Sequence, residues 1–388
     1  MVRTQDVLGG VFRVEQAARV PEATYLERTR QAEPRMGDLL YSREGTYFGI
    51  AAEVPNGIKV CLGQRMVLLR PDASLVDARY LRLWLNSPQM QRHVHGFRDG
   101  SVAERLNLPT IRGLPVAIPS LPEQRRIAAI LGALDDKIEL NRRMNKTLEE
   151  MASAIFKAWF VDFDGVIESG GDLVESELGL IPRGWEVKPV EEVAPSFGGA
   201  TPSTKKPEFW EGGTIHWTTP KDLSSLTSPV LLDTERKITE AGLGKISSGL
   251  LPEGTLLLSS RAPVGYLAIA QVPLAVNQGY IAIPPGGRLS PLWMLFWAGA
   301  NMDRIKARAG GTTFQEISKR NFRPIQVVVP PEVFSQRFDD VVGPMFERIV
   351  NNERESRTLA ELRDTLLPKL ISGELRVPQA EEMVEDVV

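Results

Sequence analysis

The sequence contains a single cysteine, Cys61, among its 388 residues. An internal disulfide and a cysteine-rich zinc site are therefore both excluded. There is no run of about 18 apolar residues that could cross a membrane, and no basic-then-apolar stretch typical of a signal peptide. These absences predict a cytoplasmic protein without a membrane segment, and the length allows two or more domains.

Catalytic motifs are also scarce. The stretch GLGKIS at 242–247 has the wrong spacing for a phosphate-binding loop, and no glycine-rich loop follows a strand in a βαβ context. Pro330-Pro331 lacks the neighbours of the adenine methyltransferase tetrapeptide Asn/Asp-Pro-Pro-aromatic. We therefore predict no catalytic residue and no bound cofactor.

Two pairs of side chains come closest to a metal site. His93 and His95 would lie on different faces of a helix, and Asp162 and Asp164 fit the end of a helix that runs into an acidic linker. We predict no metal site.

The modest net charge of −3 conceals an alternating pattern. Residues 1–120 and 181–330 each carry 16 Lys/Arg and 12 Asp/Glu, whereas residues 121–180 carry 7 and 12 and residues 331–388 carry 7 and 13. A polyanion would prefer the two basic regions. The excess is small, and most domains with such a balance bind no nucleic acid.

Two stretches, 121–163 and 332–373, have the pattern of long amphipathic helices. Good helix formers fill them, and apolar residues recur at alternating steps of four and three. Both patterns are interrupted by asparagine near the middle, which favours two helices that pair with each other in one register. The predicted pairing residues are Ile127, Leu131, Leu134, Ile138, Asn141, Leu148 and Ile155 in the first helix, and Phe338, Val342, Met345, Ile349, Asn352, Leu359 and Leu366 in the second. Arg363 is a poor residue for this seam, and Leu362 beside it is an alternative contact.

The remaining sequence predicts two related globular regions. Short strand-like runs broken by Gly, Pro and Asn indicate mixed sheets in residues 1–120 and 184–331, and GDLLYSREGTYFGIAAEV in the first matches GTLLLSSRAPVGYLAIAQV in the second. Residues 79–94 read as a helix broken near Ser87-Pro88, and a closing strand leads to Pro119. Residues 164–183 read as a linker and residues 374–388 as a disordered acidic tail.

The arrangement resembles the specificity subunit of type I restriction–modification enzymes. The stretch 121–163 is similar to that family's central spacer, and LRDTLLPKLISGELRV is similar to the end of its distal spacer. GWEVKPVEEV, GGATPS, EFWEGGTIHWTTPKDL and the GTTFQEI turn are similar to one target-recognition domain. The resemblance implies an α+β fold, in which two target-recognition domains are separated by two long antiparallel helices with pseudo-twofold internal duplication.

The resemblance also implies function and partners. Each domain would read one half of a bipartite site in double-stranded DNA, while the helices set the spacing and dock two methyltransferase subunits. Restriction subunits would join the full complex. The chain itself would be non-catalytic, and S-adenosylmethionine, ATP and Mg²⁺ are expected on the partner subunits.

Candidate DNA-binding residues lie in polar or basic turns between the predicted strands. Arginine can contact guanine bidentately or pair with phosphate, and glutamine can read adenine. The same residues also fit solvated turns or backbone-capping roles, and Trp210 and Trp217 also fit a core. The candidates are Arg43, Gln64, Ser101, Arg105 and Asn107 in the first region, and Thr204, Lys205, Lys206, Trp217, Thr218, Lys221, Arg261, Gln278, Thr312, Thr313, Gln315, Lys319, Arg320 and Asn321 in the second.

The first region departs from the family pattern at its beginning. Trp185 and Gly254 are 69 positions apart, but only 36 separate Met1 from the matching Gly37. The start is then truncated or misassigned, or this domain is a shorter variant. Two other functions stay open: a coiled-coil scaffold whose globular ends bind protein, and an enzyme with an unrecognised nuclease or methyltransferase centre.

Overall fold

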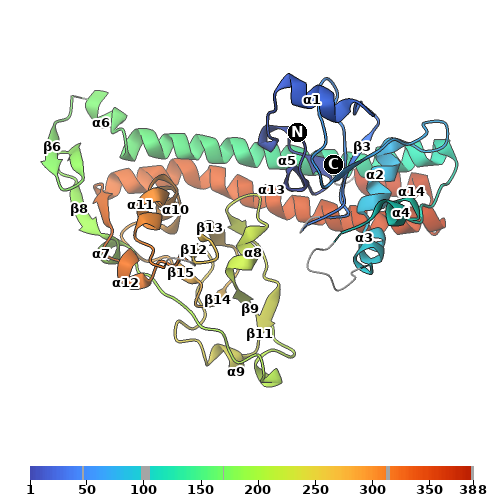
Figure 1. Cartoon of the computed structure of the whole chain (residues 1–388). Helices are drawn as coiled ribbons and strands as arrows, with labels where there is room; N and C mark the ends of the chain where they lie inside the picture. Colours follow the sequence, from blue (N-terminus) through green and yellow to red (C-terminus); the bar gives the residue numbers. More distant parts are fainter. Residues whose placement is uncertain (46–47, 98–104, 169, 312–314, 386–388) are drawn as a thin grey trace. The chain divides into compact units, whose positions relative to one another are not determined.

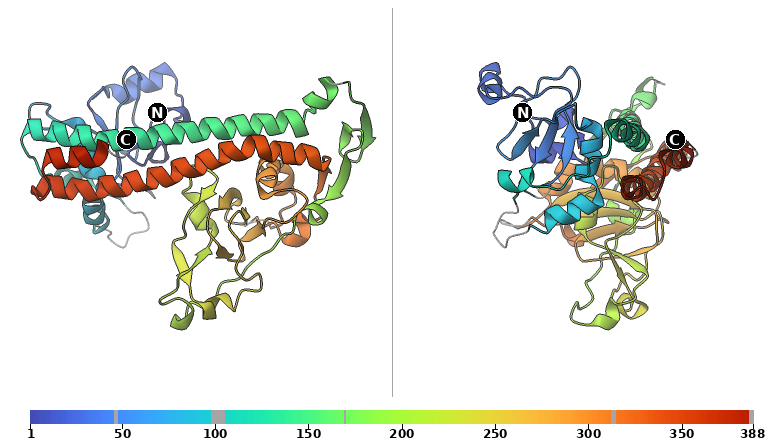
Figure 2. Two further views of the ribbon diagram at one scale, coloured as in Figure 1. Left: turned by 180° about the vertical axis from the view of Figure 1, so that it is seen from behind. Right: turned by 90° about the vertical axis from the view of Figure 1, so that its right-hand side faces the viewer.

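The structure is a computed structural model that describes residues 1–45, 48–97, 105–168, 170–311 and 315–385. Two long helices, α5 (Leu121–Phe160) and α13 (Glu332–Ser372), run through both compact units of the chain (Figure 1). Unit 1 contains Met1–Glu139 and Ser356–Val388, and unit 2 contains Leu140–Glu355. Within each unit, one half of α5 lies beside one half of α13 in antiparallel orientation (Figure 2). The predicted fold class is confirmed.

Local sequence explains where the long helices begin and end. The Ser120 carbonyl accepts hydrogen bonds from the backbone N–H groups of Glu123 and Gln124 at the start of α5. Helix α13 ends before Gly373, whose φ of 74° suits the left-handed residue that follows a helix. Helix α5 ends at Phe160 rather than at Phe163, because Phe163 leaves the helix with a φ of 59° and packs its ring against Trp185.

Unit 1 is built around a three-stranded antiparallel sheet. Strand β3 (Leu39–Ser42) lies between β4 (Ala51–Glu53) and β5 (Met66–Leu69). The helix that the sequence predicts over 79–94 is divided as expected into α2 (Ala78–Asn86) and α3 (Pro88–His95), because Ser87 caps the second helix. The remaining elements are η1 (Thr4–Asp6), β1 (Val7–Leu8), β2 (Val11–Phe12), η2 (Val14–Gln16), α1 (Glu22–Thr29), α4 (Leu108–Arg112) and α14 (Val377–Glu385).

Unit 2 repeats this framework and adds to it. Strand β12 (Leu256–Ser260) lies between β13 (Val264–Ala270) and β15 (Tyr280–Ile283), as β3 lies between β4 and β5. Additional strands form the sheet β11 (Arg236–Ile238), β9 (Ile215–Thr218) and β14 (Leu274–Val276), the pair β16 (Gln326–Val329) and β8 (Glu186–Pro189), and the strand β10 (Val230–Leu231) beside β13. The helices are α6 (Asp164–Glu168), α7 (Val190–Val193), η3 (Pro207–Phe209), α8 (Pro220–Ser224), α9 (Glu240–Leu243), α10 (Pro291–Ala300), α11 (Met302–Ala307) and α12 (Lys319–Phe322).

The internal duplication extends to single side chains. Ser42 ends β3, and its buried hydroxyl accepts a hydrogen bond from the N–H of Ile50. Ser259 occupies the matching place in β12, where its hydroxyl accepts from the N–H groups of Gly265 and Tyr266. Each serine closes the hairpin that follows it, so the same side-chain to backbone hydrogen bond stabilises the turn in both units.

The predicted linker 164–183 contains a short hairpin, formed by β6 (Leu173–Ser176) and β7 (Gly179–Pro182). Two expectations about other connecting segments are wrong. The acidic tail is not disordered over Val377–Glu385, because Val377, Ala380 and Val384 bury one face of α14 against unit 1. The residues after Leu114 form no strand before Pro119, whereas the matching residues of unit 2 form β16, which pairs with β8.

The predicted helix seam is mostly buried. Ile127, Leu131, Leu134, Leu359 and Leu366 belong to the core of unit 1, and Phe338, Val342 and Ile349 belong to the core of unit 2. Ile138, Leu148 and Ile155 are partly buried against these cores. Met345 is also only partly buried, because Phe346 beside it faces the core instead.

The seam asparagines form buried hydrogen bonds within unit 2. Asn352 donates from its side-chain amide to the Asn145 carbonyl oxygen at 2.7 Å, and Asn145 donates to Glu353 at 2.8 Å. Asn141 donates to Glu355 at 2.7 Å. Since a buried polar group without a partner is costly, these contacts favour one register of the two helices.

No helix within the described ranges is long and apolar enough to cross a membrane.

Candidate nucleic-acid interface

Three chain segments of unit 2 meet at one exposed edge of its sheets. The first is the glycine loop at Gly198–Gly199, the second is the β14–β15 turn with Gln278, and the third runs from Gly310 to α12. We call this set the loop face. Thr201, Gln278, Gln315, Lys319 and Arg320 are exposed on or beside it, while the strands beneath it are buried.

The glycine loop lies directly on β14. The N–H groups of Gly199 and Ala200 donate to the carbonyl oxygens of Asn277 and Val276, at 3.2 Å and 3.1 Å. A Cβ atom on Gly199 would lie 1.6 Å from the Val276 carbonyl oxygen, so only glycine fits. This close approach brings Thr201 to Gln278, where the threonine hydroxyl donates to the glutamine carbonyl oxygen at 2.7 Å.

The third segment is fastened to the β12–β13 hairpin. The N–H of Ile317 donates to the Ser260 carbonyl at 2.9 Å, and Arg261 pairs with Glu316. The guanidinium of Arg261 lies 3.7 Å from the Glu316 carboxylate. Ser318 then caps α12, which presents Lys319 and Arg320 to solvent. A Cβ on Gly198 would lie 3.0 Å from the Lys319 ammonium, so this cation lies over the glycine loop.

Several sequence-predicted residues therefore come together. Gln278 lies in the second segment of the loop face and Lys319 in the third, with Gln315, Arg320 and Asn321 next to Lys319 in the chain. Arg261 lies in the adjoining β12–β13 hairpin. Asn321 donates to the Arg308 carbonyl at 3.2 Å. Thr312 and Thr313 lie outside the described residues. Thr201 was missed by sequence reasoning, although the tight glycine pair before it is a signal that could have found it.

Two predicted DNA-binding residues are wrong, because they are core residues. Trp217 is 3% exposed, and its indole N–H donates to the Ala200 carbonyl at 3.1 Å. Thr218 is fully buried beside the Tyr280 hydroxyl, which lies 3.0 Å from its own. Both residues belong to β9, a strand paired on both sides, which explains their burial.

The basic residues around β9 have local partners. Lys221 pairs with Glu235 at 2.8 Å and Lys206 with Glu208 at 3.7 Å. Lys205 and Thr204 are exposed beside them. The sequence did not point to Arg236, whose guanidinium stacks 3.6 Å from the centre of the half-buried Trp210 ring.

Unit 1 has a reduced version of the same edge. The N–H of Leu106 donates to the Arg43 carbonyl at 2.7 Å, as that of Ile317 does to Ser260. Glu44 then pairs with Arg105 where unit 2 pairs Arg261 with Glu316, so the two charges are exchanged. The structural counterpart of Arg261 is therefore Glu44 and not Arg43.

The other unit 1 candidates are placed around this pairing. Gln64 is exposed in the turn before β5, matching Gln278. Asn107 caps α4 by accepting from the N–H of Thr110 at 3.0 Å, which gives it a structural role. Ser101 lies outside the described residues. No counterpart of the glycine loop occurs in the described part of unit 1.

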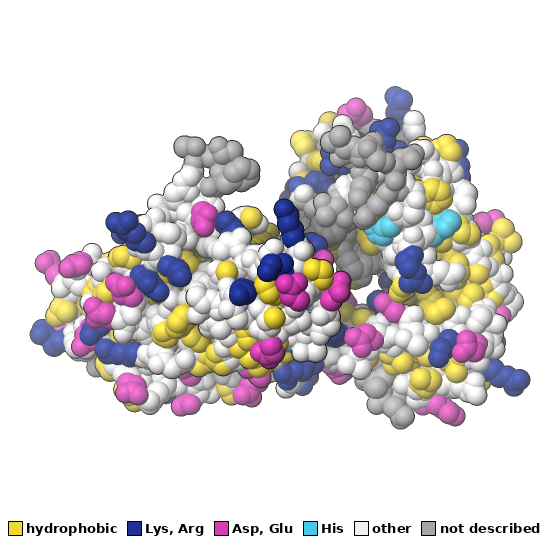
Figure 3. Space-filling view, turned by 90° about the horizontal axis from the view of Figure 1, so that it is seen from below, with side chains coloured by type: hydrophobic (Ala, Val, Ile, Leu, Met, Phe, Trp, Pro, Cys, Tyr) yellow, Lys and Arg dark blue, Asp and Glu magenta, His cyan; other side chains and the backbone are white. Residues whose placement is uncertain are grey.

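Lysine and arginine side chains do not dominate the surface. On the face drawn in Figure 3, they lie singly or in small groups among hydrophobic and acidic side chains. Among the described residues, no group of three or more His, Cys, Asp or Glu side chains could hold a metal ion. The chemistry available at these edges is hydrogen bonding and pairing with negative charge.

Comparison with known proteins identifies the family. The family model described as the type I restriction modification DNA specificity domain matches twice, at residues 20–150 and 182–337. The chain belongs to this family. Its two recognition domains, one in unit 1 and one in unit 2, correspond to the two matches.

Named relatives agree with this assignment. The specificity subunit of the type I restriction enzyme HindI from Haemophilus influenzae is 25% identical over 439 residues, covering 96% of this chain and 94% of the relative. The MjaIX specificity subunit from Methanocaldococcus jannaschii is 36% identical over 189 residues, which cover 48% of this chain but only 43% of that relative. The solved S subunit from M. genitalium has the same fold, with a TM-score of 0.50, 15% identity and coverage of 87% and 83%.

Proposed function

We propose that each recognition domain reads one half of a bipartite site in double-stranded DNA. The observation that carries this proposal is the double occurrence of one framework, in which matching turns end at matching polar residues such as Gln64 and Gln278. Loops that project from a rigid sheet can enter the major groove, where side-chain amides and guanidinium groups distinguish bases.

The long helices support the second part of the proposal. Helices α5 and α13 continue from one unit into the other without a proline or glycine break at the boundary between them. Such helices can set the number of unread base pairs between the half-sites, since each residue adds about 1.5 Å. The duplicated helix surfaces would dock two methyltransferase subunits, related by pseudo-twofold symmetry.

Catalysis belongs to partner subunits in this proposal. S-adenosylmethionine would bind to the methyltransferase subunits, and ATP and Mg²⁺ would bind in the full complex with restriction subunits. The chain described here supplies recognition only. Purified alone and mixed with DNA, Mg²⁺ and S-adenosylmethionine, it should neither methylate nor cleave.

Methylome sequencing tests the proposal. The chain is expressed with its neighbouring methyltransferase subunit, and methyl-adenine positions are mapped across the host genome. A split motif with two different halves is expected. Methylation at a motif with one half only, or at a palindrome, would show that unit 1 does not read DNA. An absence of methylation despite a purified complex would overturn the proposal and favour a protein scaffold.

A further inference from the structure

Unit 1 holds an arginine in the joint between its recognition domain and helix α5. The guanidinium of Arg79, on α2, donates to the Gly132 carbonyl oxygen at 2.9 Å and pairs with Asp136 at 2.6 Å. A Cβ atom on Gly132 would clash with this guanidinium, so the glycine leaves the room that the arginine needs. This surface of α5 is therefore an arginine-binding position, which unit 1 fills with a side chain of its own.

Unit 2 does not supply an arginine at the matching place. Ser290 caps α10 as Asp77 caps α2. Two residues after the cap, unit 2 has Leu292 where unit 1 has Arg79. Because a leucine side chain has no polar atom, α10 offers no partner to a carboxylate at this position.

Helix α13 nevertheless keeps both positions that bind the arginine. Gly343 lies 211 positions after Gly132, and Glu347 lies 211 positions after Asp136. The same shift relates the buried seam residues of the two helices. A Cβ atom on Gly343 would meet no described side chain within 4 Å, so the space beside this glycine is open.

The open space adjoins a groove between α10 and α13. The groove has a volume of about 580 Å³, and we call it the α10–α13 groove. Leu292 lines it on one side, and Phe346 and Val350 of α13 line it on the other. Ile269, near the end of β13, completes the apolar part of the lining. A long side chain with apolar methylene groups fits this lining.

The charged residues of the groove are mostly acidic. Glu253, Asp339 and Glu347 line it together with one basic residue, Arg354. Ser290 donates to Asp339 at 2.8 Å, but no lysine or arginine of the described residues forms an ion pair with any of the three carboxylates. Burial raises the pKa of Asp339, as expected where no cation offsets the loss of water. The groove therefore favours a cation.

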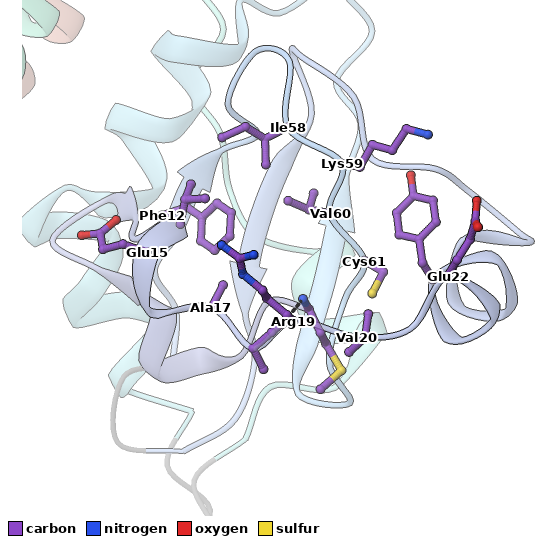
Figure 4. Close-up of a pocket in the computed structure, with 14 residues that line it drawn as sticks. Phe12, Glu15, Ala17, Arg19, Val20, Glu22, Ile58, Lys59, Val60 and Cys61 are labelled. Atoms are coloured by element: carbon purple, nitrogen blue, oxygen red, sulfur yellow. Dashed lines mark hydrogen bonds between the residues drawn. The ribbon is translucent and has the colours of Figure 1, made fainter.

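A cavity of unit 1 shows no such preference. It has a volume of about 710 Å³ and includes Phe12 in its lining (Figure 4). Its charged side chains are Glu15 and Glu22 together with Arg19 and Lys59. Because these charges balance, this cavity selects no ligand by charge.

We propose that the α10–α13 groove binds an arginine side chain of a methyltransferase subunit. This inference rests on the proposed docking of that subunit to the long helices, and it names one contact on this chain. The guanidinium would take the place that Arg79 occupies in unit 1, between Glu347 and the Gly343 carbonyl oxygen. A guanidinium suits this place better than an ammonium does, because its planar fork donates to two acceptors at once.

Cross-linking from the groove tests which partner residue enters it. Asn351 is exposed and lines the groove, and it is replaced by the photoreactive amino acid benzoylphenylalanine in the full chain. The chain is purified with its neighbouring methyltransferase subunit and irradiated, and mass spectrometry locates the cross-link. A cross-link close to an arginine of the methyltransferase is expected. A cross-link with no arginine near it, or no cross-link in an assembled complex, would overturn the proposal.

Two substitutions in this chain test the pairing itself. Glu347→Gln should raise the Kd of one methyltransferase binding step about tenfold or more, because it removes the charge partner of the arginine. The other step should be unchanged, since unit 1 carries its own arginine. Leu292→Arg should weaken the same step, because it places a guanidinium of this chain beside Glu347. Native mass spectrometry over a titration counts the bound subunits and gives both constants.

The control is Glu240→Gln, which removes the same charge from an exposed position on α9 and should change neither constant. Hydrogen exchange of unit 2 peptides verifies that each variant is folded. An unchanged Kd in Glu347→Gln would overturn the inference and leave the proposed docking intact. Failure of the unmodified chain to bind the methyltransferase would overturn both.

Discussion

At the residue scale, the residues that shape the backbone of the loop face differ from those exposed on it. Gly199 and Ser259 shape the backbone, whereas Gln278 and Lys319 are exposed at its surface. The two exposed residues differ in chemistry. The Lys319 ammonium can pair with any phosphate, while the Gln278 amide can form the paired hydrogen bonds that recognise adenine.

We expect Lys319→Ala to weaken binding of all DNA sequences similarly and to lower the slope of log K against log salt by about one. Gln278→Ala should instead relax the specificity of one half-site with little change in slope. Fluorescence anisotropy with specific and unrelated duplexes at several salt concentrations measures both effects. Lys188→Ala, which removes a lysine paired with Glu186 and Glu192, serves as the charge-matched control. A specificity change in Lys319→Ala alone would contradict the assignment.

Glu149 links the helices of unit 2 to pH. Burial, followed by the nearby Glu353 and Glu150 carboxylates, raises the pKa of Glu149 from 4.5 to about 7. The folded state therefore holds this proton more tightly than the unfolded state does. Stability from Glu149 is complete below pH 4.5 and is lost as the pH rises toward 7.

Glu149→Gln should remove this dependence. The difference in unfolding free energy between the variant and the unmodified chain should grow in favour of the variant from pH 5 to pH 8. Urea denaturation at several pH values, monitored by hydrogen exchange of α5 peptides, measures this difference. Glu150→Gln, at the exposed neighbouring position, should show a smaller change. A constant difference across this pH range would refute the role of Glu149.

At the element scale, each recognition domain joins the helix pair through the same three positions. In unit 1 these are Arg82 of α2, Asp135 of α5 and Arg363 of α13, with Asp135 lying 2.8 Å and 2.7 Å from the two guanidinium groups. Arg363, a poor seam residue by its sequence, is thus accommodated by ion pairing, while Leu362 packs partly against the same core.

The matching positions of unit 2 are apolar. Leu295 of α10, Phe346 of α13 and Ala152 of α5 all belong to its core. One joint is therefore ionic and the other is hydrophobic. If the charged α2 of unit 1 packed on the apolar helix positions of unit 2, its buried charge would have no partner. The difference therefore disfavours packing of one recognition domain on the helix positions that match the other.

Removing one charge and replacing the whole joint should have opposite outcomes. Asp135→Ala should destabilise unit 1 by about 3 kcal/mol, the lower end of the range for breaking a buried pair, because Arg82 keeps Glu53 and Arg363 keeps Asp364. The triple variant Arg82→Leu, Asp135→Phe and Arg363→Ala should recover most of this loss. Hydrogen exchange of unit 1 peptides at increasing urea concentrations measures the stability of unit 1 in both variants. A triple variant less stable than Asp135→Ala would contradict the apolar equivalence.

At the scale of the whole molecule, the helices carry the proposed spacing function. Removing one heptad from each helix, residues 141–147 and 352–358, keeps the apolar seam in phase. The helices shorten by about 10 Å, close to the rise of three base pairs.

The methylome of cells that express this double deletion should show the same two half-sites with a shorter gap between them. Deletion of a heptad from α5 alone, which puts the two helices out of register, should instead reduce the amount of assembled complex. An unchanged gap in the double deletion would exclude the helices as the element that sets spacing.

Much of the fold follows from periodicity and repetition. The two long helices, their asparagine breaks and the presence of short strands in both globular regions were predictable, because hydrophobic periodicity reports which face of an element is buried. The divided helix at Ser87-Pro88 was predictable from its cap and proline. Which candidate DNA-binding residues are exposed and which are buried was less predictable, since a tryptophan in a basic stretch fits both a core and a stacking surface.

The sequence by itself determined the family and the internal duplication. The tertiary structure decided that Trp217 and Thr218 are core residues, that Glu44 corresponds to Arg261, and that Val377–Glu385 packs as a helix. The reason is physical: burial and pairing depend on neighbours distant in the chain, which no local pattern records.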